Sequence, residues 1–228
     1  MQLALALLLA IAASPPDSPP SPLLERTCPP AVPHCAGLRI HIAAPDSAEL
    51  TTWLESQLDE ANRLFAVADI GFVPLDVTRL PTELASITTR EQRDDLGHDR
   101  FAPDTIDVYI VTHLADVDIP GAEIRGVHWR SRRDRSRRFI ILSTIAPPRV
   151  LAHELGHYFG LPHSAYPESI MNKAPRLTPP QEERRFASAE VRRIVRRAQD
   201  LFRPRALDNR ATATDVPRAK EHAEVPPR

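Results

Sequence analysis

The residues from 153 to 163 carry the pattern in this chain that is best suited to chemistry. They read His-Glu-Leu-Gly-His-Tyr-Phe-Gly-Leu-Pro-His. On a helix, His153 and His157 lie on one face because they are four residues apart, and two imidazoles so placed can bind one zinc ion at about 2.1 Å. Glu154 stands beside the first of them, where a carboxylate can accept a proton from a water molecule without binding the metal.

A third ligand follows from the end of the same stretch. Gly160 permits a sharp, left-handed turn that ends the helix and swings the chain back. His163 can then reach the metal, and three protein ligands leave the fourth position open, as in catalytic rather than structural zinc sites. The competing interpretation is a surface helix with incidental histidines, and Gly160 and His163 are the residues that argue against it.

The elements that must position these residues can be read from the hydrophobic pattern. Short apolar or alternating stretches predict five strands, at residues 38–42, 70–77, 106–111, 124–129 and 139–143. Apolar residues at three- and four-residue spacing, with capping signals, predict helices from Asp46 to Phe65, at 88–96, at 148–159 and at 178–202. This order predicts an α/β (α+β) fold with one mixed five-stranded sheet, a helix that carries the site and a C-terminal helix.

The C-terminal helix has the clearest start signal. Thr178 precedes Pro179 at the first helical position, and Gln181 completes a capping box. Its expected buried stripe is Val191, Ile194, Val195, Ala198, Leu201 and Phe202.

The two ends of the chain differ from its middle. Residues 1–13 are apolar except for Gln2 and predict a signal peptide, with a buried N-terminal helix as the alternative. Residues 14–36 are rich in proline and predict an extended linker, and residues 204–228 predict a disordered tail. The folded domain is therefore expected at 37–203, in a protein that is secreted or periplasmic.

The only two cysteines of the chain are Cys28 and Cys35. In an exported protein such a pair usually closes a disulfide. The alternative is that Cys35 supplies a thiolate that displaces the water from a zinc site.

The overall composition limits the partners that we expect. The formal net charge is −1, which gives no indication of nucleic-acid binding, and no stretch of 18 apolar residues exists that would insert stably into a membrane. We expect a monomer. The turn from Arg130 to Arg138 holds six arginines and one acid, which predicts either a solvated hairpin tip or a basic surface that draws acidic substrates.

Residues 153–163 resemble the long zinc-binding signature of the metzincin metalloproteases. Ser169-Ile170-Met171-Asn172 is similar to the methionine turn of those enzymes, and the spacing from His163 to Met171 resembles the matrixin branch. Two departures are visible. Cys35 lies in Pro33-His34-Cys35-Ala36-Gly37 rather than in the Pro-Arg-Cys-Gly context of matrixin prodomains, and the structural zinc and calcium loops usual in matrixins are not recognisable. In addition, Lys173 stands where some metzincins have a tyrosine.

The resemblance implies a secreted zinc endopeptidase. It implies that His153, His157 and His163 bind Zn²⁺, that Glu154 is general base and acid in the attack of a zinc-activated water on a peptide bond, and that Met171 is the floor of the site. Simple core packing is a compatible role for Met171. The resemblance further implies that a protein or peptide substrate binds along residues 124–129 as an added strand.

Two other functions remain open at this point. One is a catalytically idle metzincin-like binding domain, against which the intact Glu154 argues. The other is a zinc hydrolase that acts on a non-peptide amide, which the motif does not distinguish from a peptidase.

Overall fold

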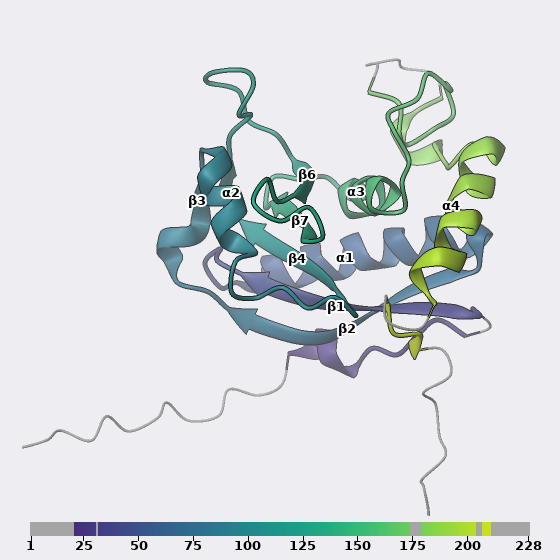
Figure 1. Ribbon diagram of the computed structural model, residues 1–228, viewed down its shortest axis with the longest axis horizontal. Coiled ribbons are helices and arrows are strands. Elements are labelled where there is room, and N and C mark those ends of the chain that lie inside the picture. Colours follow the sequence, from purple (N-terminus) through teal and green to yellow (C-terminus); the bar gives the residue numbers. More distant parts are fainter. Residues whose placement is uncertain (1–20, 31, 174–178, 204–206, 211–228) are drawn as a thin grey trace, which may run out of the picture.

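The computed structural model describes residues 21–30, 32–173, 179–203 and 207–210. A five-stranded sheet forms the centre, with helices on both of its faces (Figure 1). Its strands are β1 (His34–Ile42), β2 (Ile70–Arg79), β4 (Ile106–Val111), β6 (Gly126–Arg130) and β7 (Arg138–Ser143). The helices are α1 (Ala48–Phe65), α2 (Arg90–Leu96), α3 (Val150–Tyr158) and α4 (Ser188–Leu201), and β3 (Ser86–Ile87) and β5 (His113–Leu114) form a small second sheet.

The large sheet is mixed, as the sequence predicts. Its strand order is β2-β1-β4-β7-β6, in which only β6 runs antiparallel to its neighbour β7. The central parallel strand β4 is covered on both faces, and all six of its residues are buried. The antiparallel strand β6 is last in the strand order and therefore forms an edge of the sheet, and Figure 1 shows it beside α3.

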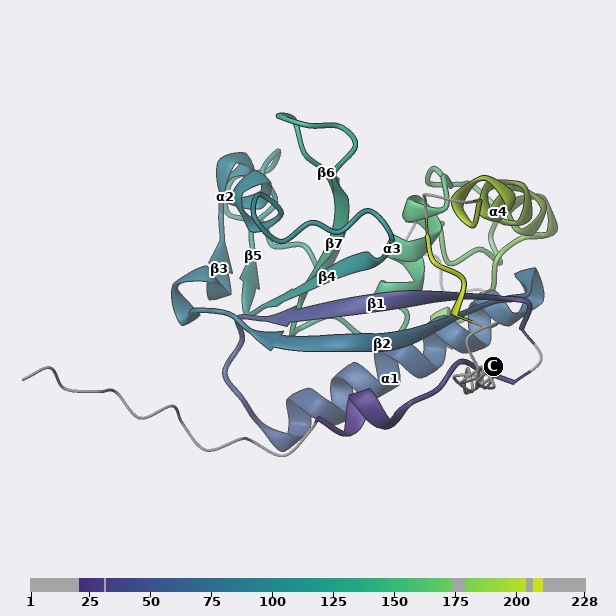
Figure 2. The same ribbon diagram turned by 60° about the horizontal axis from the view of Figure 1, so that its bottom comes forward.

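Two hydrophobic cores lie on opposite faces of the sheet. The larger core joins the sheet to α1, α3 and α4, and the smaller one lies under α2. Figure 2 shows α1 running along one side of β1 and β2, with α2 on the other side. The helix α3, which bears the histidines of the site, therefore packs in the larger core.

The strand β1 is longer than the sequence predicts and its polar face is buried. Leu38, Ile40 and Ile42 share a core face as expected, but His41 is also buried. His41 Nε2 lies 2.9 Å from Asp107 Oδ1 on the adjacent strand, and the Arg39 guanidinium also pairs with that carboxylate. Alternation predicts an exposed second face, whereas here an acid on β4 makes the burial of His41 tolerable and also pairs with the half-buried Arg39.

The helix α1 begins one residue later than expected. Ser47, rather than Asp46, is the N-cap, and its hydroxyl oxygen accepts a hydrogen bond from the Leu50 N–H at 3.1 Å. Both residues are good caps, so sequence alone does not separate them.

The predicted start of the C-terminal helix is wrong. Residues 174–178 lie outside the described residues, Gln181–Glu183 form only a short 3-10 turn, and α4 begins at Ser188. The Ala187 N–H donates to the Glu190 carboxylate at 2.8 Å, so Glu190, nine residues after the expected Gln181, completes the helix start. Val195 is 37% exposed, and it is therefore not part of the buried stripe.

The linker and the tail are both shorter than expected. Leu23 and Cys35 are buried, although both fall in the predicted 14–36 linker. Leu207 is buried as well, and the Asn209 side chain accepts from the Cys35 N–H and donates to the Pro33 carbonyl. The predicted tail is therefore wrong for residues 207–210, which pack at the start of β1.

Cys28 and Cys35 are joined by a disulfide, with Cα atoms 6.0 Å apart. The bond ties the segment before β1 to the strand itself, and Cys35 has no free thiolate to offer a metal. The predicted signal peptide at 1–13 lies outside the described residues. None of the described helices is long and apolar enough to span a membrane.

The arginine-rich turn between β6 and β7 is bound to the rest of the molecule. Arg132 pairs with Glu91 and buried Asp94, and Arg133 pairs with Asp95. These acids all belong to α2. Two of the six arginines are therefore held by α2, although residues 132–136 at the tip are all exposed to solvent.

The helix α3 has no N-cap of its own and relies on α1 instead. Gln57 of α1 is completely buried, and its side-chain oxygen accepts the Leu151 N–H in the first turn of α3 at 3.0 Å. Its amide group donates to the carbonyls of Ala146 and Pro147 at 3.2 and 2.8 Å. The Gln57 side chain thus satisfies the Leu151 N–H, which the helix start would leave without a partner, and ties α1 to the segment before α3.

We predict that Gln57→Leu lowers the free energy of unfolding by about 3 kcal/mol, because it leaves the Leu151 N–H without its hydrogen bond and removes one donor from each of the Ala146 and Pro147 carbonyls. Urea unfolding followed by circular dichroism would measure the change. Gln199→Leu on the exposed face of α4 is the matched control and should change the midpoint little. Equal midpoints for the two variants would contradict this role of Gln57.

Candidate metal centre

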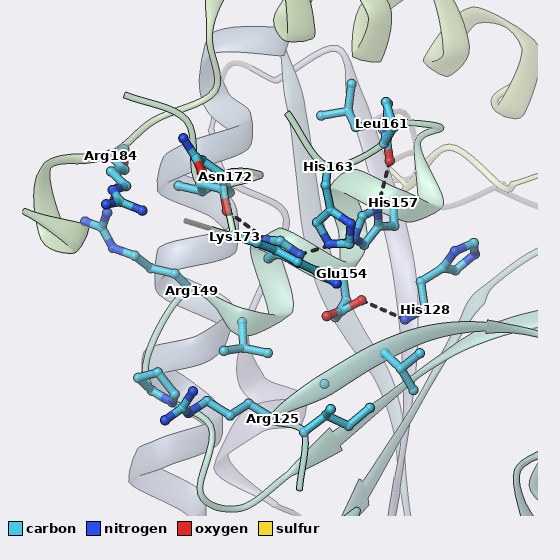
Figure 3. A pocket seen from close by; sticks show the side chains of 18 of the residues that line it. Arg125, His128, Arg149, Glu154, His157, Leu161, His163, Asn172, Lys173 and Arg184 are labelled. Atoms are coloured by element: carbon cyan, nitrogen blue, oxygen red, sulfur yellow. Dashed lines mark hydrogen bonds between the residues drawn. The ribbon is translucent and has the colours of Figure 1, made fainter. Parts of the chain in front are cut away.

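The three predicted histidine ligands converge on one point. His157 Nε2 lies 3.2 Å from His153 Nε2 and 3.1 Å from His163 Nε2. A zinc ion about 2.1 Å from each nitrogen in tetrahedral geometry requires separations close to these. Figure 3 shows the rings of His157 and His163 close to each other above the Glu154 carboxylate.

Hydrogen bonds to the other ring nitrogens orient the first two imidazoles. His153 Nδ1 lies 2.7 Å from the Ile170 carbonyl oxygen, and His157 Nδ1 lies 2.7 Å from the Leu161 carbonyl oxygen. A carbonyl only accepts, so each neutral ring carries its proton on Nδ1 and presents a lone pair at Nε2. Two lone pairs 3.2 Å apart repel each other unless a cation lies between them, so these residues fit a zinc ion.

The protonation of the histidines also suits metal binding. Burial lowers the pKa of His153 to about 4 and that of His157 below its ordinary value. Burial, together with the nearby positive charges, lowers the pKa of His163 to about 4. At neutral pH all three rings are therefore unprotonated and able to bind a cation.

The turn at Gly160 does two things at once. Gly160 has φ +87°, and the N–H groups of Gly160 and Leu161 donate to the carbonyls of His157 and Gly156 at 2.9 Å. This Schellman-type turn ends α3 and directs the Leu161 carbonyl at the ring of His157. The predicted left-handed turn is present, and it orients the second ligand as well as delivering the third.

Met171 lies buried beneath the helix, in contact with Gly156. A Cβ at Gly156 would lie 2.7 Å from the Met171 sulfur, so only glycine at this position lets the methionine pack so closely. The Met171 carbonyl accepts the Ser164 N–H at 3.1 Å, which ties the turn to the residue after the third ligand.

The methionine turn is held in place from α4. Ser169 is fully buried, its hydroxyl donates to the Glu190 carboxylate at 2.7 Å, and its oxygen accepts the Met171 N–H at 2.9 Å. Glu190 is the same residue that completes the start of α4. The C-terminal helix thus positions the floor of the site and, through Ile170, the first ligand.

Glu154 lies next to the convergence point but is directed toward β6. Its side chain is almost fully buried and its Oε2 atom accepts the His128 N–H at 2.6 Å (Figure 3). Burial raises its pKa to about 7, although the hydrogen bond and the charge of Lys173 act in the opposite direction. A carboxyl group with a pKa near neutrality is suited to accept and return a proton.

Arg149 immediately precedes α3 and links three parts of the structure. Its backbone is left-handed, with φ +86°. Its Nε lies 2.9 Å from Glu60 Oε2 on α1, and its Nη1 donates to the Arg184 carbonyl at 2.9 Å. This strained residue thus holds the start of the histidine helix against both α1 and the segment before α4.

The sequence prediction missed these supporting residues. Gln57 could have been noticed, because a glutamine between Leu54 and Leu58 falls on the apolar face of its helix. Arg149, Ser169 and Glu190 carry no such signal, because their partners are distant in sequence.

The site opens into a pocket of about 890 Å³ between α3 and the edge of the sheet. Its walls include the three histidines and Glu154, the chain from Ile124 to His128, and residues of the segments around Lys173 and Arg184. The edge strand and the metal centre therefore face the same space.

Comparison with known proteins agrees with this description. Residues 107–197 match the family model of the matrixins. The resemblance to the metzincins, and to the matrixin branch in particular, is thus confirmed for the part of the chain that carries the three histidines and Met171. No curated protein matches the chain.

Solved structures of similar shape include two archaeal proteins. One is an archaemetzincin from Methanopyrus kandleri, with 16% identity and a TM-score of 0.48 over 72% of this chain and 96% of the other. The other is a zinc-dependent peptidase from Methanocorpusculum labreanum, with 15% identity and a TM-score of 0.42 over 69% of this chain and 100% of the other.

The raised pKa of Glu154 predicts how pH affects the stability of the metal-free protein. In the unfolded chain Glu154 ionises near 4.5, but in the fold its pKa is about 7. The stability associated with its protonated form is present below pH 4.5 and is lost as the pH rises through 7. Glu154→Gln should therefore be more stable than the parent at pH 8 and similar to it at pH 4.

Denaturant unfolding in the presence of a chelator, from pH 4 to pH 8, would measure this difference. The three histidines titrate in both proteins, so their contribution cancels in the comparison. A stability difference that does not change with pH would show that Glu154 is not held in its neutral form.

Proposed function

We propose that this chain is an exported zinc-dependent endopeptidase, with His153, His157 and His163 as metal ligands and Glu154 as the general base. The observation that carries the proposal is the convergence of three unprotonated Nε2 atoms beside a buried carboxyl group, in a pocket bounded by an open strand edge.

The edge strand β6 supports a peptide as the substrate. At the two ends of β6, backbone hydrogen bonds continue the pairing with β7: the Arg125 carbonyl accepts the Ser143 N–H, and the Ser131 N–H donates to the Arg137 carbonyl. By alternation, the backbone groups of Gly126, His128 and Arg130 point away from β7. An extended peptide can pair with this side of β6, and Glu154, bound to the His128 N–H, then lies beside its backbone.

Each residue has a defined part in hydrolysis. When bound, the zinc ion supplies a Lewis acid that acidifies a water molecule and polarises the peptide carbonyl. Glu154 accepts the proton of that water and delivers it to the leaving amine, which its pKa of about 7 permits in both directions. The Ile170 and Leu161 carbonyls keep the ligand rings in position throughout.

Export is supported by two features of the N-terminal part. Residues 1–13 have the composition of a signal peptide. The Cys28–Cys35 disulfide is typical of proteins that work in oxidising compartments.

Glu154→Gln is expected to lower the rate of peptide hydrolysis by about 10²- to 10⁴-fold, because the general base is lost, while zinc stays bound. The measurement is hydrolysis of casein and of quenched fluorescent peptides by the chain lacking residues 1–13, with zinc content from elemental analysis. His157→Ala is the control that should lose the metal together with the activity.

The outcomes separate the competing functions. Zinc bound without hydrolysis of any peptide would favour a binding domain, and hydrolysis of small amides alone would favour a different amidase. Peptidase activity that survives Glu154→Gln would contradict the proposed mechanism.

A further inference from the structure

Cationic side chains outnumber acidic ones on the wall of the metal-centre pocket. Six arginine or lysine residues line it: Arg93, Arg125, Arg149, Lys173, Arg184 and Arg193. Because the whole chain has a net charge of −1, this concentration is local rather than a reflection of composition.

Three of the six cations are used by the fold itself. Arg149 pairs with Glu60, as described above. Arg184 is buried and donates to the Pro179 carbonyl at 3.2 Å. Arg93 donates to the Ala115 carbonyl at 2.7 Å and lies over the Trp129 ring. None of these three needs a ligand to account for its position.

The other three cations have no such use. Within the described part of the chain, the side chains of Arg125, Lys173 and Arg193 make no hydrogen bond and no ion pair, and all three are exposed. They come from three separate elements, namely the start of the edge strand, the segment after the methionine turn, and α4. Three unpaired cations around one pocket repel each other unless an anion joins them.

Lys173 and Arg125 line the pocket on the side of the metal centre and along the edge strand, respectively. Figure 3 shows Lys173 near Glu154 and Arg125 farther along the pocket, below the Glu154 carboxylate in this view. Lys173 is close enough for its charge to lower the pKa of each of the three histidines and of Glu154. Arg125 directly precedes Gly126, the first residue of the strand that would pair with a peptide.

The acids of the pocket do not neutralise these cations. Asp118 is paired with Arg90, and Glu123 is paired with His113. Asp116 accepts the N–H groups of Asp118 and Ile119 at 2.8 and 3.3 Å, and its charge acts on Arg93. The remaining acid, Glu154, is buried against β6. The uncompensated charge of the pocket is therefore positive.

We propose that this pocket selects peptides that carry an aspartate or glutamate side chain next to the scissile bond, and that Arg125 and Lys173 bind its carboxylate. The inference rests on the proposed peptidase function, whose substrate class it names. A carboxylate in the pocket gains charge-assisted hydrogen bonds from groups that otherwise face only water and each other. A lysine or arginine side chain in the same place is repelled.

The test measures peptide binding to the zinc-loaded Glu154→Gln variant, in which hydrolysis does not interfere. The probes are fluorescent octapeptides with an amidated C-terminus, identical except for Glu, Gln or Lys on either side of the central bond. Fluorescence anisotropy should show the Glu peptide binding about fivefold more tightly than the Gln peptide, and the Lys peptide more weakly, as expected for partly exposed ion pairs. The preference should decrease as salt is raised, because salt screens exposed charges.

Substitutions test which groups read the charge. Arg125→Gln and Lys173→Gln, each added to Glu154→Gln, should each reduce the Glu-over-Gln preference to about twofold, since each removes one exposed partner. Arg135→Gln is the matched control, because Arg135 is an exposed arginine at the β6–β7 turn and does not line the pocket. A preference that survives both pocket substitutions would mean that the carboxylate binds the metal instead, and would overturn the inference.

Two further outcomes decide against the inference. Equal binding of the Glu, Gln and Lys peptides overturns it, as does a preference found only for peptides with a free C-terminal carboxylate. Cleavage of the same peptides by the parent protein separates the two proposals. Hydrolysis without a charge preference would support the peptidase function and contradict the acidic selectivity. Selective binding of the Glu peptide without hydrolysis would contradict the peptidase function and support a pocket that binds acidic peptides.

Discussion

The metal centre depends on two backbone carbonyls, those of Ile170 and Leu161. Each accepts a hydrogen bond from the Nδ1 of a histidine and so fixes the tautomer and the direction of the ring. Without these hydrogen bonds, the two rings could turn so that the Nε2 lone pairs of His153 and His157, 3.2 Å apart, no longer face each other. Several neighbouring segments hold these two carbonyls in position.

Different devices deliver them. The Leu161 carbonyl is local to the helix, because the turn at Gly160 places it against the last turn of α3. The Ile170 carbonyl comes from a separate segment, which Ser169 and Glu190 attach to α4. On the other side, Gln57 and Arg149 fasten the start of α3 to α1. The ligands are therefore held by both helical layers of the large core, and a site so supported loses little energy to reorganisation when it acts.

The electrostatics of the site combine burial with uncompensated charge. Burial keeps the histidines unprotonated and Glu154 near the midpoint of its titration at neutral pH. Among the described residues, Arg125, Lys173 and Arg193 remain exposed and unpaired on the pocket wall, so the pocket has a positive potential even before a metal ion adds to it. Such a field attracts anionic groups into the cleft and orients them there.

Local information in the sequence determined the ligand set, the left-handed turn at Gly160 and the approximate positions of the strands and of α1 to α3. These features depend on spacing along the chain and on residues whose conformational preferences act over a few positions. The start of α4 was misjudged, because a strong local signal at Thr178 and Pro179 competes with the long-range hydrogen bond from Ser169 to Glu190. The tertiary structure alone decided that Gln57 caps α3, that His41 is buried beside Asp107, and that Leu207 and Asn209 pack against the domain. It also decided that unpaired cations from three separate parts of the chain line the pocket of the metal centre. Each of these depends on contacts between residues far apart in sequence, and no periodicity along the chain encodes which distant group a side chain will meet.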